Sequence, residues 1–444
     1  MANVYVSFLG TNNYLHCHYH TASFITPEPV RFVQEATVRY RCSNWGSEDR
    51  ILIFTTEEAE NKNWKDGGHV DPDSKVPHEG LCSRLAKLNL KTPVHPIRIE
   101  PGYDSEQIWR QFDTIFEALK PGDHVVFDIT HAFRSIPMLA MVVIQYARVF
   151  KSIGVEGIYY GAFEALGSFQ EVKKISSEDR KAPIIDLQPL AELMDWTVAT
   201  DRFLKGGDAA MIGELARRSV EPILKETRGA DEGARAVRKL GKCLEAFSMA
   251  LSTCRGLEIS DAAFQLKEQS AVCSRLNLLP PFAKLFDRIE ERIRGFSKDH
   301  VRDGLIAVRW CCEHGLIQQG FTLLEELLFS AVLLELYPDP DQKKILQNMT
   351  YRDIVSQSFG IISNKLKPDG WNQPAADHRQ EVEAMLDWIR QKPGLVEAYG
   401  KIRERRNDLN HAGHNNNALS LSRAAQFSNE LKELVSQVES ALLT

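Results

Sequence analysis

The chain has 444 residues, enough for two or three domains with packed cores. Hydrophobic residues make up 43% and charged residues 26%, which is typical of a globular protein in water. The formal net charge of -6 excludes a global basic field, so any nucleic-acid site has to be local.

The first 190 residues predict strands that alternate with helices. Strands are expected at residues 4–9, 51–56, 96–99, 124–128, 157–161 and 184–187. Helices are expected at residues 57–64, 80–88, 104–119 and 136–151. Residues 14–30 suit a hairpin or loop insertion, and residues 32–42 suit either a helix or a strand. The alternation predicts an α/β fold with a doubly wound, mostly parallel, Rossmann-like sheet.

After about residue 190 the pattern changes to helical periodicity, and strand signals disappear. Helices are expected over residues 190–220, 232–256, 260–296, 300–335, 342–360, 377–391, 394–412 and 420–443. The fold class is therefore α/β plus all-α.

Residues 125–137 predict a ligand site at the end of a strand. The apolar residues 125–127 suit a buried parallel strand, and Asp128, Thr130 and His131 then bring a carboxylate, a hydroxyl and an imidazole into a short turn. In an open α/β sheet, ligands bind where strands end and helices begin. The alternative is an ordinary loop whose polar groups bond to one another.

The turn after the first strand has similar chemistry. Gly10, Thr11, Asn12 and Asn13 follow the predicted strand at residues 4–9. Gly and Asn tolerate positive φ, and Thr and Asn side chains can bind phosphate or ribose. This turn is the second part of the predicted ligand site.

Residues 403–414 carry a different set of chemical groups. Arg406 shares helical spacing with an apolar stripe, which is costly for a guanidinium unless it meets an anion or a carboxylate. Asn407 and His411 lie four residues apart on an adjacent face, and Gly413 is expected to end the helix. Arg, an amide and His at one helix end could hold and cleave a phosphodiester. The alternative is a solvated helix end with surface salt bridges.

Taken together and in this order, the two stretches resemble one family. It is the CARF–HEPN group of CRISPR-associated accessory ribonucleases from type III systems, in the branch with a D-x-T-H-G motif. Residues 128–134, Asp-Ile-Thr-His-Ala-Phe-Arg, resemble that motif, while residues 8–14 and 159–162 resemble two strand ends of the same domain. Residues 406–411, Arg-Asn-Asp-Leu-Asn-His, resemble the HEPN pattern R-x4-H, and residues 319–327 resemble the partner helix.

The resemblance implies a domain order and an activity. A CARF-like sensor of cyclic oligonucleotides is expected at residues 1–190, a helical linker region at 191–300 and a HEPN-like ribonuclease domain at 301–444. A homodimer, or a larger oligomer, would cut single-stranded RNA in antiviral defence when cyclic oligoadenylate binds. Neither a metal nor a cofactor is expected, since RNA carries its own 2′-OH nucleophile. The products should then carry 2′,3′-cyclic phosphate ends.

The resemblance also assigns roles to residues. Arg406 would stabilise the scissile phosphate, His411 would move the proton, and Asn407 would hold a phosphate oxygen or orient His411. The implied ligand-binding residues are Gly10, Thr11, Asn12, Asn13, Asp128, Thr130, His131, Ala132, Phe133 and Arg134. Ala132 stands where the family usually has Gly, which leaves the ring size open between cyclic tetra-adenylate, the favoured activator, and cyclic hexa-adenylate.

Two other functions stay open. One is a non-catalytic, nucleotide-sensing regulatory dimer, in which Arg406 is paired with an acidic residue and no RNA is cut. In the other, the sensor domain itself cleaves the cyclic ligand slowly, with Thr130 or His131 nearby. Glu325 and Glu326 could orient Arg406 or form ordinary ion pairs.

Several features suggest a cytoplasmic protein. The eight cysteines form no CxxC pairs and suit reduced, buried thiols. The N-terminus lacks the pattern of a signal peptide, and no apolar run is expected to span a membrane. His16, His18 and His20 alternate as metal ligands on a strand would, but no fourth ligand is near, so exposed or ligand-facing histidines are expected.

Overall fold

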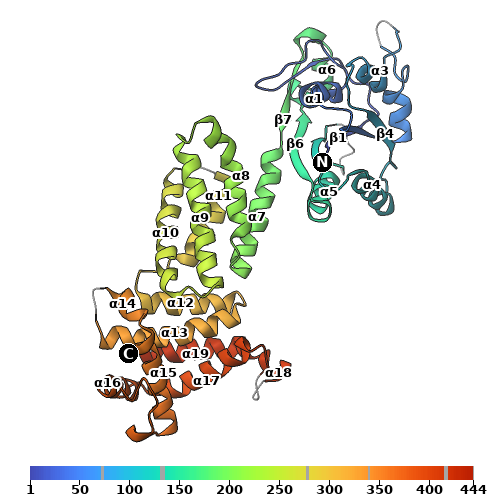
Figure 1. The fold of residues 1–444 in the computed structure, drawn as a ribbon. Helices are drawn as coiled ribbons and strands as arrows, with labels where there is room; N and C mark the ends of the chain where they lie inside the picture. The colour runs from blue at the N-terminus through green and yellow to red at the C-terminus, as the bar shows by residue number, and fades with distance from the viewer. Residues whose placement is uncertain (72–74, 131–135, 277–279, 339–340, 415–418, 444) are drawn as a thin grey trace. The chain divides into compact units, whose positions relative to one another are not determined.

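A computed structural model describes residues 1–71, 75–130, 136–276, 280–338, 341–414 and 419–443. The chain divides into two compact units, Met1–Glu192 and Leu193–Thr444 (Figure 1). The first unit contains a sheet covered by helices, and the second is helical throughout the part that is described. The predicted combination of an α/β part followed by an all-α part is confirmed.

Seven strands of the described chain form one sheet in the order β2-β7-β6-β5-β1-β3-β4. The strands are β1 (Asn3–Leu9), β2 (His18–His20), β3 (Arg50–Thr55), β4 (Val94–Arg98), β5 (His124–Asp128), β6 (Gly154–Gly161) and β7 (Lys181–Asp186). The five from β6 to β4 are parallel, whereas β7 runs antiparallel to β6 and parallel to β2. The mostly parallel sheet was predicted; β2 was not, since three residues carry too little pattern.

Helices cover both faces of this sheet. The helices of the first unit are α1 (Val33–Cys42), α2 (Glu57–Ala59), α3 (Leu81–Ala86), α4 (Ser105–Ala118), α5 (Ile136–Lys151) and α6 (Phe169–Val172), with a π-helical turn η1 (Glu60–Trp64) and 3-10 turns η2 (Phe163–Leu166) and η3 (Ser177–Asp179). On β1, Val4 and Val6 pack with α4 and α5, while Tyr5 packs with α1 and α3. Figure 1 shows these two pairs of helices on opposite sides of the sheet. The central strands are therefore buried on both sides, which explains their continuous apolar sequences.

The second unit is a set of packed helices. α7 (Gln188–Gly206) starts before the unit boundary and continues into it. The others are α8 (Ala210–Glu226), α9 (Glu232–Ser252), α10 (Gly256–Arg275), α11 (Pro280–Ile293), α12 (His300–Glu313), α13 (Ile317–Leu336), α14 (Gln342–Leu346), α15 (Met349–Asn364), α16 (Arg379–Arg390), α17 (Leu395–Asn410), α18 (Leu421–Ala424) and α19 (Phe427–Leu443), with a 3-10 turn η4 (Pro368–Gly370).

The helical region agrees with the prediction in type but not in every boundary. The single helices predicted over residues 190–220 and 300–335 are each two helices. Gly207 and Gly315 take φ of +69° and +70°, a conformation that ends an α-helix and that Gly adopts without strain. The periodic apolar pattern continues across each break, so it did not reveal the interruption.

α13 is the central helix of the second unit. By length and composition alone it could cross a membrane, whereas no membrane-spanning run was expected from the sequence. However, 67% of its most apolar window is buried, and the helix packs against α12, α15, α17 and α19. A core helix of a folded domain has the same composition, so this packing accounts for its apolar character.

Candidate functional site

The carboxyl ends of β1, β5 and β6 border a cavity of about 490 Å³ in the first unit. Three of the predicted ligand-binding residues line it, namely Asn12, Asn13 and Thr130. The other lining residues are Tyr14, Leu15, Tyr19, Tyr160, Gly161, Phe163, Glu164 and Phe169. The cavity therefore lies at the sheet edge where the sequence predicts a ligand site.

Asp128 lies beneath this cavity and does not line it, because its side chain is fully buried. Its Oδ2 accepts hydrogen bonds from the hydroxyls of Tyr5 (2.8 Å) and Thr37 (2.7 Å). Its Oδ1 accepts from the backbone N–H (3.0 Å) and the hydroxyl (2.6 Å) of Thr130. Burial raises the pKa of Asp128, although these donors act in the opposite direction. In this structure the carboxyl group positions Thr130, and no ligand could reach it.

Thr130 joins two strand ends. Its hydroxyl donates to Asp128 and accepts from the backbone N–H of Gly161 at 2.9 Å, so β5 and β6 are tied together at the cavity. A Cβ atom at Gly161 would lie only 2.4 Å from Cγ2 of Val33, so only glycine fits there without a shift of α1. The following predicted residues lie outside the described part of the chain: His131, Ala132, Phe133 and Arg134.

The turn after β1 is held by its backbone. The side-chain amide of Asn63 donates to the carbonyl oxygens of Gly10 (2.8 Å) and Asn12 (2.9 Å), and Nε2 of His69 bonds to the carbonyl oxygen of Thr11 (3.1 Å). Gly10 and Thr11 do not line the cavity. None of the four residues of this turn takes positive φ, although Gly and Asn would tolerate it. Instead, the π-helical turn η1 places Asn63 where its side-chain amide can bond to the turn.

The sequence missed the aromatic side of the cavity. Tyr160, at the end of β6, donates its hydroxyl hydrogen to Oε1 of Glu164. Burial, together with Glu164, raises the pKa of Tyr160 to about 12, so the phenol stays protonated at neutral pH. Phe163 and Phe169 follow on η2 and α6. The sequence signal for this side was the strand end at residues 159–162, and nothing in it indicated the two phenylalanines.

The second candidate site lies at the C-terminal end of α17. Nε of Arg406 is 3.2 Å from Oε2 of Glu325 on α13, and the side chains are 33% and 5% exposed. Burial raises the pKa of Glu325, while the Arg406 charge lowers it. Of the two partners left open for Arg406, an anion or a carboxylate, the structure shows a carboxylate. Arg405 is the more buried neighbour and bonds through Nε to Glu430 at 2.6 Å.

Asn407 and His411 complete the predicted group. Oδ1 of Asn407 is 3.5 Å from Nη1 of Arg406, and the backbone N–H of His411 donates to the carbonyl oxygen of Asn407 at 3.0 Å. His411 is the first residue after α17, and its side chain is exposed. Gly413 has φ of +71° and bonds back to the carbonyl oxygen of Asp408, so the helix ends where the sequence predicts. One chain thus presents Arg, Asn and His at one helix end.

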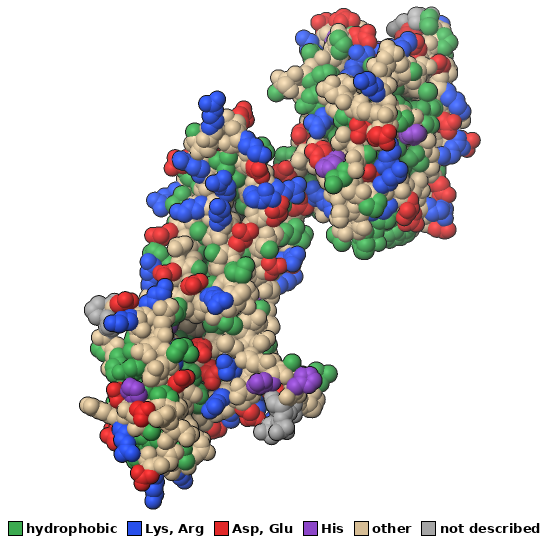
Figure 2. Space-filling model, in the orientation of Figure 1, with side chains coloured by type: hydrophobic (Ala, Val, Ile, Leu, Met, Phe, Trp, Pro, Cys, Tyr) green, Lys and Arg blue, Asp and Glu red, His purple; other side chains and the backbone are tan. Residues whose placement is uncertain are grey.

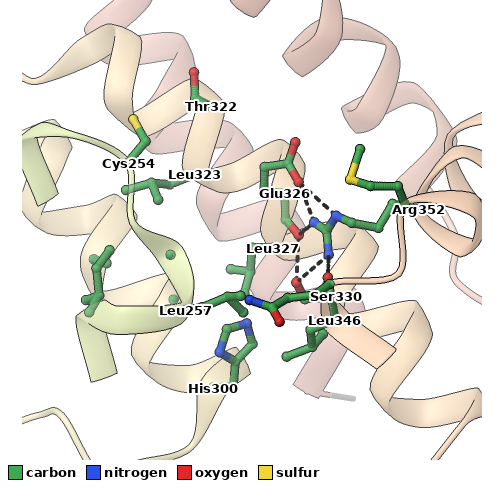
Figure 3. Close-up of a pocket in the computed structure, with 16 residues that line it drawn as sticks. Cys254, Leu257, His300, Thr322, Leu323, Glu326, Leu327, Ser330, Leu346 and Arg352 are labelled. Atoms are coloured by element: carbon green, nitrogen blue, oxygen red, sulfur yellow. Dashed lines mark hydrogen bonds and ion pairs between the residues drawn. The ribbon is translucent and has the colours of Figure 1, made fainter. Parts of the chain in front are cut away.

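Glu326, the next residue on α13, serves a different arginine. Its Oε2 lies 3.1 Å from Nε of Arg352 on α15, beside a cavity of about 590 Å³ (Figure 3). Arg352 also donates to the carbonyl oxygens of Leu346 (3.0 Å) and Glu326 (2.8 Å). Burial, assisted by the Arg352 charge, lowers the pKa of His300 on the opposite wall. The adjacent glutamates therefore neutralise two arginines, one on α17 and one on α15.

A local basic groove of about 590 Å³ lies between α8 and α9, where Lys and Arg side chains gather on the surface (Figure 2). Its basic lining residues are Arg217, Lys225, Arg235, Arg238 and Lys242. The first two are paired with glutamates of α8. No ion pair within the described residues involves the other three, which are exposed on α9. This groove is a local positive surface in a chain of negative net charge.

The alternating histidines do not form a metal site with one another. Nδ1 of His18 is 2.8 Å from the carbonyl oxygen of Thr26, and its Nε2 is 3.4 Å from Glu178. Across the described ranges, no group of three or more His, Cys, Asp or Glu side chains could hold a metal ion.

Comparison with known proteins supports a relationship to a curated protein. No family model matches the chain. A curated protein of Methanocaldococcus jannaschii, CRISPR-associated protein MJ1674, is 30% identical over 276 residues. The match covers 60% of this chain and 38% of that protein, so the chain spans less than two-fifths of the relative's length. The similarity supports the coarser part of the sequence prediction, a relationship to CRISPR-associated proteins.

Proposed function

We propose that this chain is a metal-independent endoribonuclease of the CARF–HEPN type, which cleaves single-stranded RNA in CRISPR antiviral defence when cyclic oligoadenylate binds. The observation that carries the proposal is the cavity at the ends of β1, β5 and β6. Its amide side chains, Asn12 and Asn13, suit phosphate and ribose oxygens. Its rings, Phe163, Phe169 and Tyr160, suit stacking against adenine. The similarity to a CRISPR-associated protein supports a role in CRISPR defence.

The helical unit would carry out the cleavage. The 2′-OH of the RNA attacks the adjacent phosphorus, and the 5′-oxygen of the next nucleotide leaves. Arg406 would stabilise the extra negative charge on the phosphorane, and His411 would transfer the proton. Glu325 would hold Arg406 in place from α13. The products are a 2′,3′-cyclic phosphate and a 5′-hydroxyl end.

A homodimer would complete this site. Exposed apolar side chains on α4 and α5 support self-association: Trp109, Met138, Val142, Val149 and Phe150 are each more than half exposed. The ring centroids of Tyr146 and Phe150 are 4.2 Å apart at this face. An apolar face of this kind on a folded unit marks an interaction surface. A second copy is the occupant that the proposal requires, because a HEPN-type site uses the Arg and His residues of both copies.

The basic groove between α8 and α9 would hold the RNA backbone. Arg235, Arg238 and Lys242 recur at helical spacing along α9, so they form one stripe. Their charges are not neutralised by ion pairs within the described chain. Phosphate binding to such a surface would be strongly salt-dependent.

A second candidate function is a non-catalytic nucleotide sensor. One observation favours it: Arg406 is paired with Glu325, as that function predicts. The two candidates differ in what happens to RNA. Ligand cleavage by the sensor domain receives less support, because the hydroxyl of Thr130 is already bonded to Asp128 and Gly161.

The test is cleavage of a fluorescent single-stranded RNA in EDTA, with and without cyclic tetra-adenylate and cyclic hexa-adenylate. We expect cleavage with one of the two rings, and the 2′,3′-cyclic phosphate identifies the chemistry. His411→Ala should abolish cleavage and leave ligand binding intact. The matched control is His414→Ala, an exposed histidine three residues further on.

The outcomes separate the candidates. Ligand binding without RNA cleavage would favour the non-catalytic sensor. Cleavage at the wild-type rate by the His411→Ala variant would refute the assigned role. Recovery of shortened, linear adenylate after incubation would show that the sensor domain also cleaves its ligand.

A further inference from the structure

Arg31 is a buried cation with neutral partners. Its side chain is 3% exposed. Nη2 donates to Oδ1 of Asn63 (2.8 Å) and to Oδ1 of Asn13 (3.2 Å), and Nη1 donates to the carbonyl oxygen of Glu79 (3.4 Å). Nε is buried without a hydrogen-bond partner. Burial lowers the pKa of Arg31 to about 10, so the guanidinium remains charged at neutral pH.

Arg180 is a second buried cation of the same kind. It is 9% exposed and lies at the end of the segment before β7. Nη1 donates to the carbonyl oxygen of His16 (3.0 Å), while Nε and Nη2 donate to the carbonyl oxygens of Val172 (3.1 Å) and Lys173 (3.4 Å). Within the described chain, neither Arg180 nor Arg31 has a carboxylate partner.

Other arginines of the first unit show what ordinary pairing looks like. Arg39 and Arg84 share the fully buried carboxylate of Glu35, each at 2.8 Å, and both also meet Glu28. A buried charge is costly unless it is paired, so a guanidinium without a carboxylate stands out against this background. Two such groups close to one segment require a reason beyond packing.

The two arginines hold the same segment from both ends. Arg31 holds Asn13 directly, and through Asn63 it supports the carbonyl oxygen of Asn12. Arg180 holds the carbonyl oxygen of His16. Residues 12–19 supply one wall of the cavity, including Asn12, Asn13, Tyr14, Leu15 and Tyr19. Both positive charges are therefore located directly behind a wall that a ligand would touch.

We propose that Arg31 and Arg180 are positioning residues of the cavity, whose uncompensated charges hold residues 12–19 in place and attract the phosphates of a cyclic oligoadenylate. This inference rests on the proposed function for the identity of the ligand. The bound phosphates supply the negative charge that the protein itself does not place beside these cations. The positive field reaches the ligand from behind Asn13 and Tyr14, so no direct contact with the guanidinium groups is needed.

The test compares Arg31→Met and Arg180→Met with Arg39→Met, which removes a guanidinium already neutralised by glutamates. Affinity for fluorescent cyclic tetra-adenylate and cyclic hexa-adenylate is measured on the full chain at several salt concentrations. A unit charge acting over roughly 10 Å at an effective dielectric of about 20 changes affinity about tenfold at low salt. We expect this loss, with a flatter salt dependence, for the first two variants and a change below about twofold for the third.

Charge-retaining variants separate electrostatics from structure. Arg31→Lys and Arg180→Lys keep the charge but lose the planar fork of donors. They should recover most of the salt dependence, which a purely structural hydrogen-bond role would not restore. If the Met variants fail to fold, Arg31→Gln and Arg180→Gln replace them, because they keep an amide donor and lose the charge, and the same loss of affinity with a flatter salt dependence is expected. Unchanged affinity and salt slope in the Gln variants would overturn the inference.

A second probe, inorganic tripolyphosphate, keeps this inference separate from the proposed function. If the wild type binds neither ring, the proposed function fails, and the tripolyphosphate-induced thermal shift decides the inference. A shift that requires Arg31 but not Arg39 supports an anion-binding cavity. Equal thermal shifts in Arg31→Met and Arg39→Met overturn the inference, as does the absence of a shift in the wild type. Equal ring affinity and salt slope in the wild type, Arg31→Met and Arg180→Met also overturn it, and leave the function standing.

Discussion

Replacing Asp128 by Ala should destabilise the first unit strongly. The carboxyl group accepts four hydrogen bonds in a fully buried position, from Tyr5, Thr37 and twice from Thr130. After truncation, the hydroxyls of Tyr5 and Thr37 still have each other at 2.6 Å, and Thr37 can donate to the carbonyl oxygen of Val33 at 3.1 Å. The N–H and hydroxyl of Thr130 lose their acceptor. The change therefore leaves two part-buried donors of Thr130 without that acceptor.

The expected size follows from those two donors. A fully buried, unsatisfied donor costs about 1–3 kcal/mol, and these two are part-buried, so Asp128→Ala should lower the free energy of unfolding by about 3 kcal/mol. Asp128→Asn should cost only about 1–2 kcal/mol, because its oxygen still accepts from Thr130 and its amide can donate to the Tyr5 hydroxyl. Burial raises the pKa of Asp128 and so favours the neutral form of the carboxyl group, which agrees with this ranking.

The assay is hydrogen exchange followed by mass spectrometry, on peptides that cover β1 and β5. Peptides from α13 and α17 serve as the internal reference, because the two units need not unfold together. A loss of about 3 kcal/mol corresponds to exchange that is roughly a hundredfold faster from the globally opened state. Equal effects of the Ala and Asn variants, or an Ala effect below about 1 kcal/mol, would refute the reasoning. Loss of ligand binding in Asp128→Asn at unchanged stability would instead place the carboxyl group in contact with the ligand.

Three further predictions concern other positions. Gly161→Ala should destabilise the first unit by about 2 kcal/mol and weaken ligand binding, because its Cβ would overlap Val33, as differential scanning fluorimetry and a binding titration would show. Burial raises the pKa of Glu325 in the folded state, so its contribution to stability is lost as pH rises from the ordinary value of 4.5 through the raised one. Glu325→Gln should therefore make the free energy of unfolding in urea less dependent on pH between pH 4 and 7. The same variant should slow RNA cleavage. Reversing Arg235 and Arg238 to Glu should weaken RNA binding at least about tenfold at low salt in fluorescence anisotropy, whereas reversing the surface residues Arg288 and Arg390 should not.

Long apolar runs were the most predictable part of the fold. Residues 125–127 are buried on both faces of the sheet, so their composition alone indicates a central parallel strand. Residues 32–42 were ambiguous, and the structure resolves them as α1, which packs over Tyr5. Their sequence pattern suits either a helix or a strand, and the helix forms because it packs against the sheet. The additional helix ends at Gly207 and Gly315 depend on backbone conformations that periodicity does not report.

The candidate ligand site was predictable where it follows strand ends. Asn12, Asn13 and Thr130 come directly after β1 and β5, and parallel strands end at the same sheet edge. Phe163 and Phe169 have no such marker, since they lie on short helical turns after β6. The antiparallel return of β7 then closes that segment beside the cavity.

The sequence by itself determined the fold class, the strand-end turns and the Arg, Asn and His residues at the end of α17, because each rests on local order along the chain. Tertiary structure alone decided which charges are buried and what they meet. In the sequence, Arg31 resembles any loop arginine, and Arg39 differs from it in no visible way. Folding places Arg39 beside Glu35 and leaves Arg31 among amides and carbonyl oxygens behind the cavity. The burial and partners of a charge depend on neighbours far apart in the chain, which no local pattern records.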